Sequence, residues 1–207
     1  PPLILDNCFI KRVHQHRHLG LWLSSSLNWD KQIHATLMKA NGKLAVLRSV
    51  KFLDRATLDL LYKLTIRSVI EYGMIVYFHS LTQTQKASLS RVQYRAARLC
   101  TGALPYTSQV KLELDLGWPP LAERADFLSL TVFHKISLNL TRPLIRKCMP
   151  SFKLKNINTR STVPFNPFPF KHVYFSKTFF PYTTNLYNKL PYCIRKERVI
   201  LEFKSRL

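Results

Sequence analysis

Apolar residues recur at helical spacing in the first half of the chain, and this spacing most strongly limits the fold. From Trp29 the apolar positions follow at steps of four, four, three, four and three residues, which lines one face of an α-helix. The residues of this stripe are Trp29, Ile33, Leu37, Ala40, Leu44 and Leu47. We therefore expect a mainly α protein, in which Asn28 is the N-cap of a helix that starts at Trp29.

Capping and breaking residues predict the following helices. Asp54 is placed to cap a long, mostly buried helix that runs to about Phe78. A further helix is expected from about Thr84 to Cys100, and Gly102 stands where its C-cap would fall. These boundaries predict two more helices after the first one.

Two shorter signals complete the expected bundle. Ser108 and Gly117 bound a short helix, and the pair Pro119-Pro120 opens the segment "PLAERADFLSLTVFHKISL". We expect about five helices over residues 29–138, packed as a bundle. Its expected core is Trp29, Ile33, Leu37, Leu44, Leu61, Leu64, Val69, Ile70, Val92, Ala96, Leu99 and Trp118.

The two ends of the chain differ in sequence pattern from the helical part between them. Residues 3–23 read as a β-hairpin, with "LILDNCFIKRVH", a polar turn and "HLGLWL". Residues 141–171 are rich in proline and lack periodicity, which predicts mostly irregular and loosely packed chain. The expected organisation is a hairpin over 1–25, a helical bundle over 26–140, and a loop-rich basic region with short strands and helices over 141–207.

The charge balance limits the partners. The chain has 32 Lys+Arg against 11 Asp+Glu, a formal net charge of +21, whereas a small soluble domain needs only about 2 to 8. Such an excess attracts polyanions, so nucleic acid and anionic membranes are the two classes to weigh. The most apolar run, "SVIEYGMIVYF", contains Glu71 and is shorter than the roughly 20 residues of a membrane span. We therefore expect nucleic acid, and no membrane, as the partner.

The positive charge is concentrated in one stretch. From Phe127 to Lys196 there are 12 Lys/Arg and no Asp or Glu, interleaved with aromatics as in "TVPFNPFPFKHVYF". Basic and aromatic residues together suit single-stranded nucleic acid. The alternative is that the aromatics pack a tail onto the helices, and we favour it for most of them.

Catalytic motifs are missing from the sequence. The eleven acids include no Asp-Asp or D-x-D pair for catalytic Mg²⁺, and there is no P-loop, G-x-S-x-G or H-E-x-x-H motif. We expect no catalytic residue, metal, cofactor or small-molecule substrate. The four cysteines lack zinc spacing and are expected to be reduced, mostly buried thiols of an intracellular protein. "PPLILDNCFI" lacks the features of a signal peptide, and a start without Met suggests a fragment or a processed product.

Three histidines alternate near the N-terminus. His14, His16 and His18 would share a face of a strand and could ligate a metal. No fourth ligand lies nearby in the sequence, so we favour a partly exposed hairpin tip.

Three arginines form the candidate binding site. Arg91, Arg95 and Arg98 recur at i, i+4 and i+7, which places them on one side of a helix beside an apolar stripe. Guanidinium groups match pairs of phosphate oxygens. A solvated face is the alternative, but no acid lies between Lys86 and Lys111 to neutralise the arginines. We therefore expect Lys86 and the three arginines to contact nucleic acid.

Five blocks from His18 to Leu207 also resemble non-LTR (LINE-type) retrotransposon reverse transcriptases. "HLGLWLSSSLNWDKQI" is similar to the segment Y-L-G-V-x-L-D-x-x-L-x-W-x-x-H-I that follows their palm. "IRSVIEYGMIVY", "LSRVQYRAARLCTG" and "LDLGWPPLAERA" are similar to the next three blocks, and "SKTFFPYTTNLYNKLP" with "FKSRL" to the closing one. The departures are His18 for Tyr, Ser24 for Asp, Ser68 for Pro, Tyr77 and Tyr187 for Trp, and Tyr182 for Arg.

The resemblance covers the thumb and post-thumb region only. The family's fingers and palm, with the Tyr-x-Asp-Asp motif and its metal ions, lie upstream of the matching part. A polymerase thumb grips the sugar-phosphate backbone of the template-primer, which implies phosphate contact by the arginine helix. The function expected is a non-catalytic, nucleic-acid-binding fragment of an RNA-directed DNA polymerase. Two alternatives stay open, namely part of a longer active enzyme and a decayed remnant without a selected function.

Overall fold

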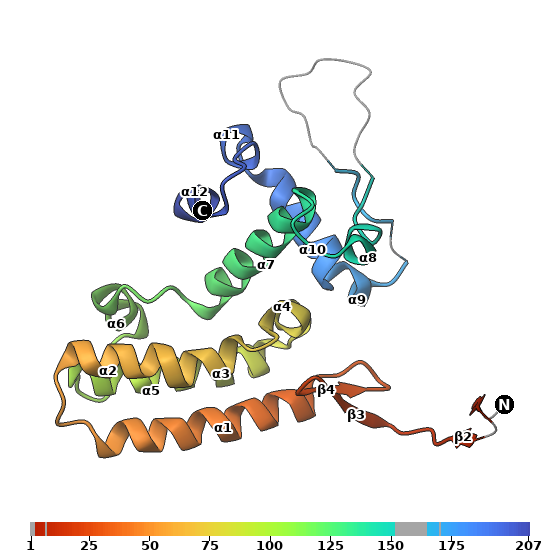
Figure 1. The fold of residues 1–207 in the computed structure, drawn as a ribbon. Helices are drawn as coiled ribbons and strands as arrows, with labels where there is room; N and C mark the ends of the chain where they lie inside the picture. Colours follow the sequence, from red (N-terminus) through yellow and green to blue (C-terminus); the bar gives the residue numbers. More distant parts are fainter. Residues whose placement is uncertain (1–2, 7, 152–164, 170) are drawn as a thin grey trace. The chain divides into compact units, whose positions relative to one another are not determined.

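The computed structural model describes residues 3–6, 8–151, 165–169 and 171–207. Helices dominate, and the strands among these residues all lie before residue 25, which confirms the mainly α fold class (Figure 1). The chain divides into two compact units. Unit 1 comprises Pro1–Tyr72 and Gln83–Pro105, and unit 2 comprises Gly73–Thr82 and Tyr106–Leu207. The helices expected to form one bundle over 29–138 are thus divided between the two units.

The N-terminal segment of unit 1 forms two consecutive hairpins. Strand β1 (Leu3–Leu5) pairs antiparallel with β2 (Cys8–Ile10), and β3 (Gln15–His18) pairs with β4 (Leu21–Ser24). The single hairpin expected here was wrong in detail, because the histidine-rich segment taken as its turn is strand β3. The chain reverses instead at Leu19-Gly20, where φ is 45° and 84°. Positive φ at both residues is what a two-residue hairpin turn of type I′ requires, and Gly20 adopts it without strain.

The remaining elements of unit 1 are helical. They are α1 (Asp30–Ser49), α2 (Arg55–Leu61), the π-helical segment η1 (Tyr62–Arg67), α3 (Ser68–Glu71) and α5 (Gln83–Thr101). Asp54 caps α2 as predicted, because its carboxylate accepts the Thr57 backbone N–H at 3.0 Å. The predicted cap at Asn28 is wrong, since α1 starts one residue later with Trp29 at the N-cap.

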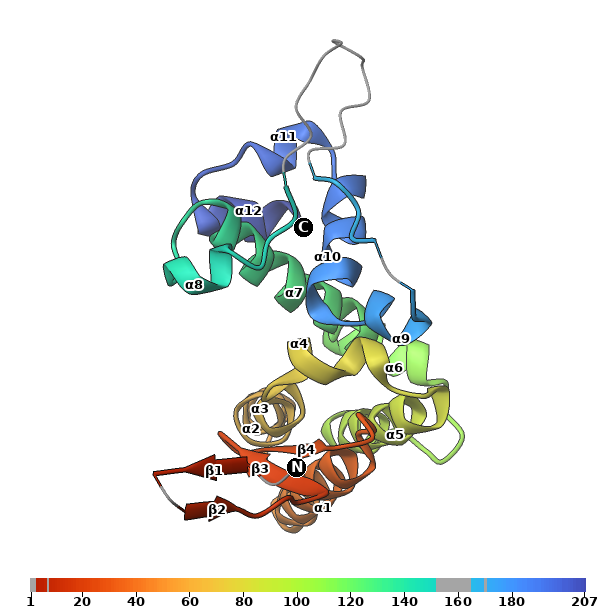
Figure 2. The same cartoon turned by 90° about the vertical axis from the view of Figure 1, so that its right-hand side faces the viewer.

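Helix α1 packs against α5 and against η1 and α3. Figure 2 views α1 and α2 nearly along their axes and shows α5 beside them. Ile33, Ala40 and Leu44 bury the predicted apolar face of α1. The hydrophobic stripe that was read from the sequence therefore forms the core of unit 1.

The π-helical segment changes which residues are buried after Asp54. Leu58, Tyr62, Ile66 and Ile70 recur at constant steps of four residues and are all at most 2% exposed. In a regular α-helix residues four apart drift by about 40° per step, and a wider π turn compensates for this drift. Leu64, predicted to be core, is 63% exposed as a result.

The other predicted core residues are buried to different degrees. Trp29, Ile33, Leu44, Ile70, Val92, Ala96 and Trp118 are buried, which confirms their prediction. Leu37, Leu61, Val69 and Leu99 are half-buried.

Unit 2 contains the remaining helices of the described chain. They are α4 (Met74–Tyr77), the 3₁₀ turn η2 (Phe78–Ser80), α6 (Gln109–Leu116), α7 (Leu121–Ser137), α8 (Pro143–Arg146), α9 (Val173–Ser176), α10 (Phe179–Lys189), α11 (Tyr192–Arg195) and α12 (Ile200–Arg206). The continuous helix expected as far as Phe78 is interrupted at Gly73, where φ is 67°. Gly117 ends α6 in the same left-handed conformation, as predicted.

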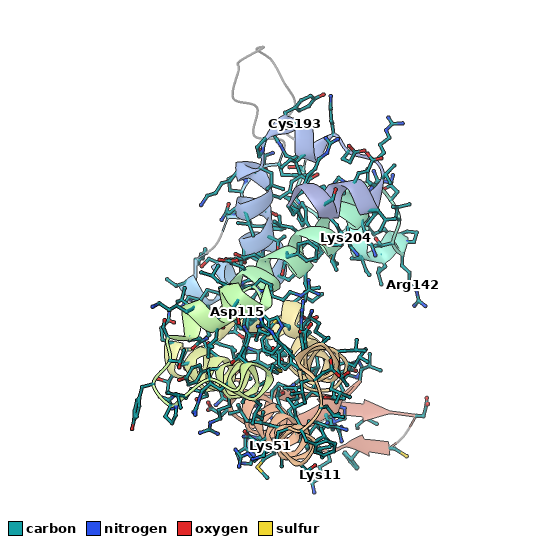
Figure 3. All side chains as sticks on the ribbon, turned by 90° about the vertical axis from the view of Figure 1, so that its left-hand side faces the viewer. Lys11, Lys51, Asp115, Arg142, Cys193 and Lys204 are labelled. Atoms are coloured by element: carbon teal, nitrogen blue, oxygen red, sulfur yellow. The ribbon has the colours of Figure 1, made fainter. Side chains whose placement is uncertain are left out.

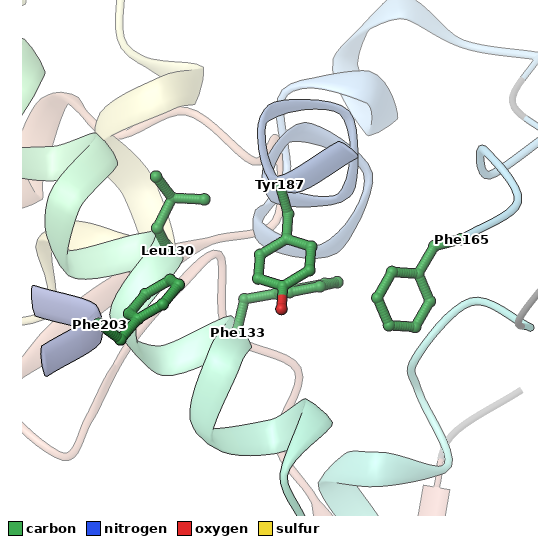
Figure 4. Close-up of a cluster of buried hydrophobic side chains, with 5 residues drawn as sticks. All are labelled: Leu130, Phe133, Phe165, Tyr187 and Phe203. Atoms are coloured by element: carbon green, nitrogen blue, oxygen red, sulfur yellow. The ribbon is translucent and has the colours of Figure 1, made fainter. Parts of the chain in front are cut away.

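The core of unit 2 is aromatic and is built around α7 (Figure 4). Its buried residues are Leu130, Phe133, Phe165, Tyr187 and Phe203. The rings of Phe133 and Phe165 meet edge to face with centroids 5.4 Å apart. The interpretation that aromatics pack the tail onto the helices is confirmed for these residues.

Phe165 corrects the expectation of loose packing over 141–171. It is 1% exposed, and the Asn188 side chain bonds both its backbone N–H and its carbonyl, at 3.3 and 3.0 Å. Helix α8 also lies in this segment, whereas residues 152–164 and 170 lie outside the described residues. The short strands expected in 141–207 do not occur among its described residues.

Candidate nucleic-acid interface

Helix α5 presents the three arginines as the sequence predicted. Its buried side includes Val92 and Ala96, whereas Arg91 and Arg95 are exposed and Arg98 is half-buried. Gly102, with φ at 66°, ends the helix just after Thr101. The arginine stripe therefore runs along the last three turns of a rigid helix.

Two of the arginines line a hollow in unit 1 that they share with one cation in the last turn of α1 and one that follows this helix. Arg95 and Arg98 face Arg48 and Lys51, which lie at the end of α1, across a volume of about 440 Å³ (Figure 3 labels Lys51). The remaining wall is formed by Leu99, Gly102 and Ala103. We call this site the cationic hollow.

The electrostatics of the cationic hollow favour an anion. Among the described residues, no carboxylate forms an ion pair with Arg48, Lys51, Arg95 or Arg98. Cations at helix C-termini also complement the helix dipole, and here α1 and α5 both end beside the hollow. Two helix ends contribute only about −0.5 charge each, so roughly +3 remains of the four positive charges. The dipoles therefore account for a minor part of this charge.

Arg98 has a donor that the described protein does not satisfy. Its Nε is buried and has no hydrogen-bond partner among the described residues. Its guanidinium lies 5.8 Å from the ring centroid of Tyr94, near enough for a weak cation–π contact. An unpaired buried donor is unfavourable, and an acceptor oxygen in the hollow would relieve it after a small side-chain movement.

The other predicted site residues lie outside the hollow. Arg91 continues the stripe about 6 Å before Arg95, since a helix rises about 1.5 Å per residue. Lys86 is half-buried and lies at least about 120° around α5 from the arginines. The structure therefore brings Arg95 and Arg98 together with Arg48 and Lys51, and not with Lys86.

Sequence reasoning missed Arg48 and Lys51. Their proximity to the arginines follows from the packing of α1 on α5, which local sequence does not reveal. The available signal was two cations three residues apart at the end of a predicted helix.

The histidines and cysteines give no second site. His16 and His18 lie on β3 with ring centroids 6.4 Å apart, and His14 precedes this strand. No group of three His, Cys, Asp or Glu in the described chain is placed to hold a metal ion.

The cysteine prediction was correct in part. All four thiols are free, but Cys8, Cys148 and Cys193 are exposed, so the expectation of mostly buried thiols was wrong. Burial raises the pKa of Cys100 to about 11, which makes this thiol unreactive.

A buried polar cluster in unit 2 resembles a catalytic triad in its contacts only. His79 Nε2 lies 3.3 Å from Ser129 Oγ, and its Nδ1 lies 3.8 Å from Asp126 Oδ1. Ser129 is 0% exposed, and the ring of Tyr182 stacks on His79 with centroids 3.8 Å apart. A substrate cannot reach the hydroxyl, so we interpret the cluster as a structural link between η2, α7 and α10.

No protein-family model, curated protein or solved structure matches the chain. Within the described residues, none of the helices combines the length and the apolar character that crossing a membrane requires.

Proposed function

We propose that this chain is the thumb and post-thumb region of a non-LTR retrotransposon-type reverse transcriptase, and that it binds template-primer nucleic acid without catalysing a reaction itself. The observation that carries the proposal is the cationic hollow between the ends of α1 and α5. The resemblance of five sequence blocks to that family supports the same assignment.

Backbone phosphate is the ligand that the hollow suits best. Three of its four cations are arginines on helices, with Arg48 on α1 and Arg95 and Arg98 on α5. Guanidinium forks match phosphate oxygens in pairs, and contacts to phosphate carry no sequence information. Binding is therefore expected to be strongly salt-dependent and nearly independent of sequence.

A charge-matched pair of variants tests the proposal. R95Q/R98Q removes two charges from the hollow, and R142Q/K147Q removes two exposed charges from the acid-free stretch of unit 2. Affinity for an RNA–DNA hybrid is measured against salt concentration for each variant. Each lost phosphate contact should flatten the slope of log K against log salt by about 0.9, and should weaken binding about fivefold near 0.15 M salt.

Only R95Q/R98Q should show the weaker binding and the flatter salt dependence. The loss of affinity should be the same for every hybrid sequence. Equal losses for both pairs would mean that the net charge, rather than the hollow, binds the hybrid. A loss confined to R142Q/K147Q would place the interface in the stretch from Phe127 to Lys196.

A further inference from the structure

A second pocket lies in unit 1, on the other flank of the buried stripe of α1. Its volume is about 520 Å³, within the range of pockets that hold small ligands. The hairpin β3–β4, the first half of α1 and the segment from Ser68 to Tyr72 form its walls. None of these wall residues belongs to the cationic hollow.

Hydrogen bonds connect the walls of this pocket to one another. The backbone N–H of Trp22 on β4 donates to Gln32 Oε1 on α1 at 2.9 Å. The Tyr72 hydroxyl donates to the Leu19 carbonyl at 2.5 Å, and the same ring lies against the Gly20 turn. The two aromatic residues are thus held in place before any ligand binds, which lowers the entropic cost of binding.

The wall residues combine the chemistries that a nucleotide presents. Trp22 and Tyr72 supply aromatic surface, and Arg17 and Lys39 supply two exposed positive charges. None of the described residues that line the pocket is acidic. One face of Trp22 is already covered by Lys31, whose Nζ lies 3.6 Å from the ring centroid.

Buried polar groups complete the pocket. Gln32 and Thr36 are both 5% exposed, and Gln32 Nε2 donates to Thr36 Oγ1 at 3.3 Å. This bond leaves a second amide hydrogen on Gln32 and the hydroxyl hydrogen on Thr36. Both can donate to the acceptor nitrogen and oxygen atoms at the edge of a base.

We propose that this pocket binds one unpaired nucleotide of a nucleic-acid strand, with its base stacked on Tyr72 and Trp22 and its phosphate bound by Arg17 and Lys39. The inference rests on the proposed function, because the nucleotide belongs to the strand that the hollow binds. A paired base cannot reach the pocket without leaving its stack. The nucleotide is therefore one at a strand end or in an unpaired segment.

Adenosine monophosphate is the probe, and calorimetry on the full chain is the measurement. Adenosine monophosphate should bind more tightly than adenosine or inorganic phosphate. Base stacking on an aromatic side chain contributes about 1–3 kcal/mol, so Tyr72→Leu should weaken binding at least fivefold. Tyr106→Leu is the matched control, because Tyr106 is fully exposed and lies in unit 2.

Two further variants keep the test valid if Tyr72→Leu disturbs the hairpin. Ala35→Phe fills the pocket from the α1 wall without removing a contact, and should block adenosine monophosphate. R17Q/K39Q should abolish the preference for adenosine monophosphate over adenosine and leave adenosine binding unchanged.

The result that overturns the inference is distinct from failure of the proposed function. Adenosine monophosphate that binds no better than inorganic phosphate, or a loss with Tyr106→Leu equal to that with Tyr72→Leu, would exclude the nucleotide pocket. The hybrid titrations with R95Q/R98Q do not depend on this outcome. Conversely, adenosine monophosphate would still bind against Trp22 and Tyr72 if the hollow failed to bind the hybrid.

Discussion

Gly20 and Gly42 occupy opposite kinds of backbone position in unit 1. Gly20 has φ at 84°, and a Cβ built there would lie 3.2 Å from the Tyr72 ring and hydroxyl. Gly42 lies in the middle of α1, where a Cβ would meet nothing within 4 Å. Adding a methyl group should therefore change the free energy of unfolding in opposite directions at the two positions.

Gly20→Ala should lower the free energy of unfolding by about 1–3 kcal/mol, because a non-glycine residue at positive φ is strained and the ring of Tyr72 must also move. Gly42→Ala should raise it by about 0.5–1 kcal/mol, since alanine is the better helix former. Urea denaturation monitored by circular dichroism measures both values. Effects of the same sign would contradict the two assigned environments.

His134 links three helices of unit 2 in its neutral form. It is 0% exposed, and its ring stacks on Phe203 with centroids 3.7 Å apart. Its Nε2 donates to the Glu197 carbonyl at 2.7 Å, because a carbonyl can only accept. Its Nδ1 therefore accepts from the Tyr187 hydroxyl, at 2.9 Å.

Acid should destabilise unit 2 through His134. Burial lowers the pKa of His134, and the bond to the Glu197 carbonyl opposes this only in part. A histidine whose pKa is lower in the folded state stabilises the fold above its unfolded pKa of about 6.5, and this stabilisation is lost as pH falls below that value. The melting temperature should thus fall between pH 7 and pH 5.

His134→Phe isolates this contribution from the other histidines. The variant should be less stable than the wild type at pH 7, because the Glu197 carbonyl and the Tyr187 hydroxyl lose their partner. Its melting temperature should change less between pH 7 and pH 5. A pH dependence as steep as that of the wild type would exclude His134 as the titrating group.

At the scale of single residues, the candidate site was predictable only where the signal was local. Arg95 and Arg98 share a helix face, and spacing alone places them together. Arg48 and Lys51 join them through contacts between α1 and α5, which are far apart in sequence. The burial of Phe165 depends likewise on Asn188, which lies 23 residues later.

At the scale of elements, η1 is the feature that departs most from regular structure. Two hydroxyls donate to carbonyls in or next to this widened segment, Thr65 Oγ1 to the carbonyl of Leu61, which precedes it, and Ser68 Oγ to the Leu64 carbonyl, both at 2.6 Å. A π turn corresponds to one extra residue in an α-helix. Removal of that residue should therefore restore regular geometry.

Deletion of Leu64, which is exposed, should be tolerated. The buried stripe from Leu58 to Ile70 would then follow steps of four, three and four residues, which is the spacing of a regular α-helix. We expect a loss of less than about 1 kcal/mol in the free energy of unfolding, with unchanged helix content by circular dichroism.

Deletion of Lys43, an exposed residue of α1, is the matched control. It rotates the rest of a regular helix by about 100° and exposes Leu44 and Leu47, which should cost about 3 kcal/mol or more. Equal costs for the two deletions would show that η1 has no spare residue.

Caps and breaks were predictable to the extent that they act locally. Asp54 and Gly117 bond within their own helices, so their sequence context was sufficient. The interruption at Gly73 was not predicted, because nothing in its neighbours reveals that α4 packs with α7 and α10, and η2 with α7, in unit 2. The π turn has no signature in composition and depends on which side chains α1 and α5 cover.

At the scale of the whole molecule, both units are discontinuous in sequence. The chain passes from one unit to the other after Tyr72, after Thr82 and after Pro105. The segment Gly73–Thr82 buries Met74, Tyr77 and Phe78 in unit 2. A break after Tyr106 would therefore leave part of unit 2 on each fragment.

A specific protease site inserted after Tyr106 tests this arrangement. Tyr106 is fully exposed, and its φ of 71° marks an irregular turn. After cleavage the two fragments should co-elute in size-exclusion chromatography, because α4 of the first packs on α7 and α10 of the second. In the same cleaved protein M74D/Y77A should release the fragments. Fragments that separate without these substitutions would contradict the assignment of Gly73–Thr82 to unit 2.

The division of unit 2 into two separate stretches of sequence also has a consequence during synthesis on the ribosome. Met74, Tyr77 and Phe78 leave the ribosome before α7, which ends at Ser137 and against which they pack. At about 5–20 residues per second, the chain between them takes roughly 3–12 s to synthesise. For that interval the helix α7, against which these three side chains pack in unit 2, is still incomplete, whereas residues 1–72 of unit 1 have already been synthesised. The order of translation thus places Met74, Tyr77 and Phe78 outside the ribosome before most of unit 2 has been synthesised.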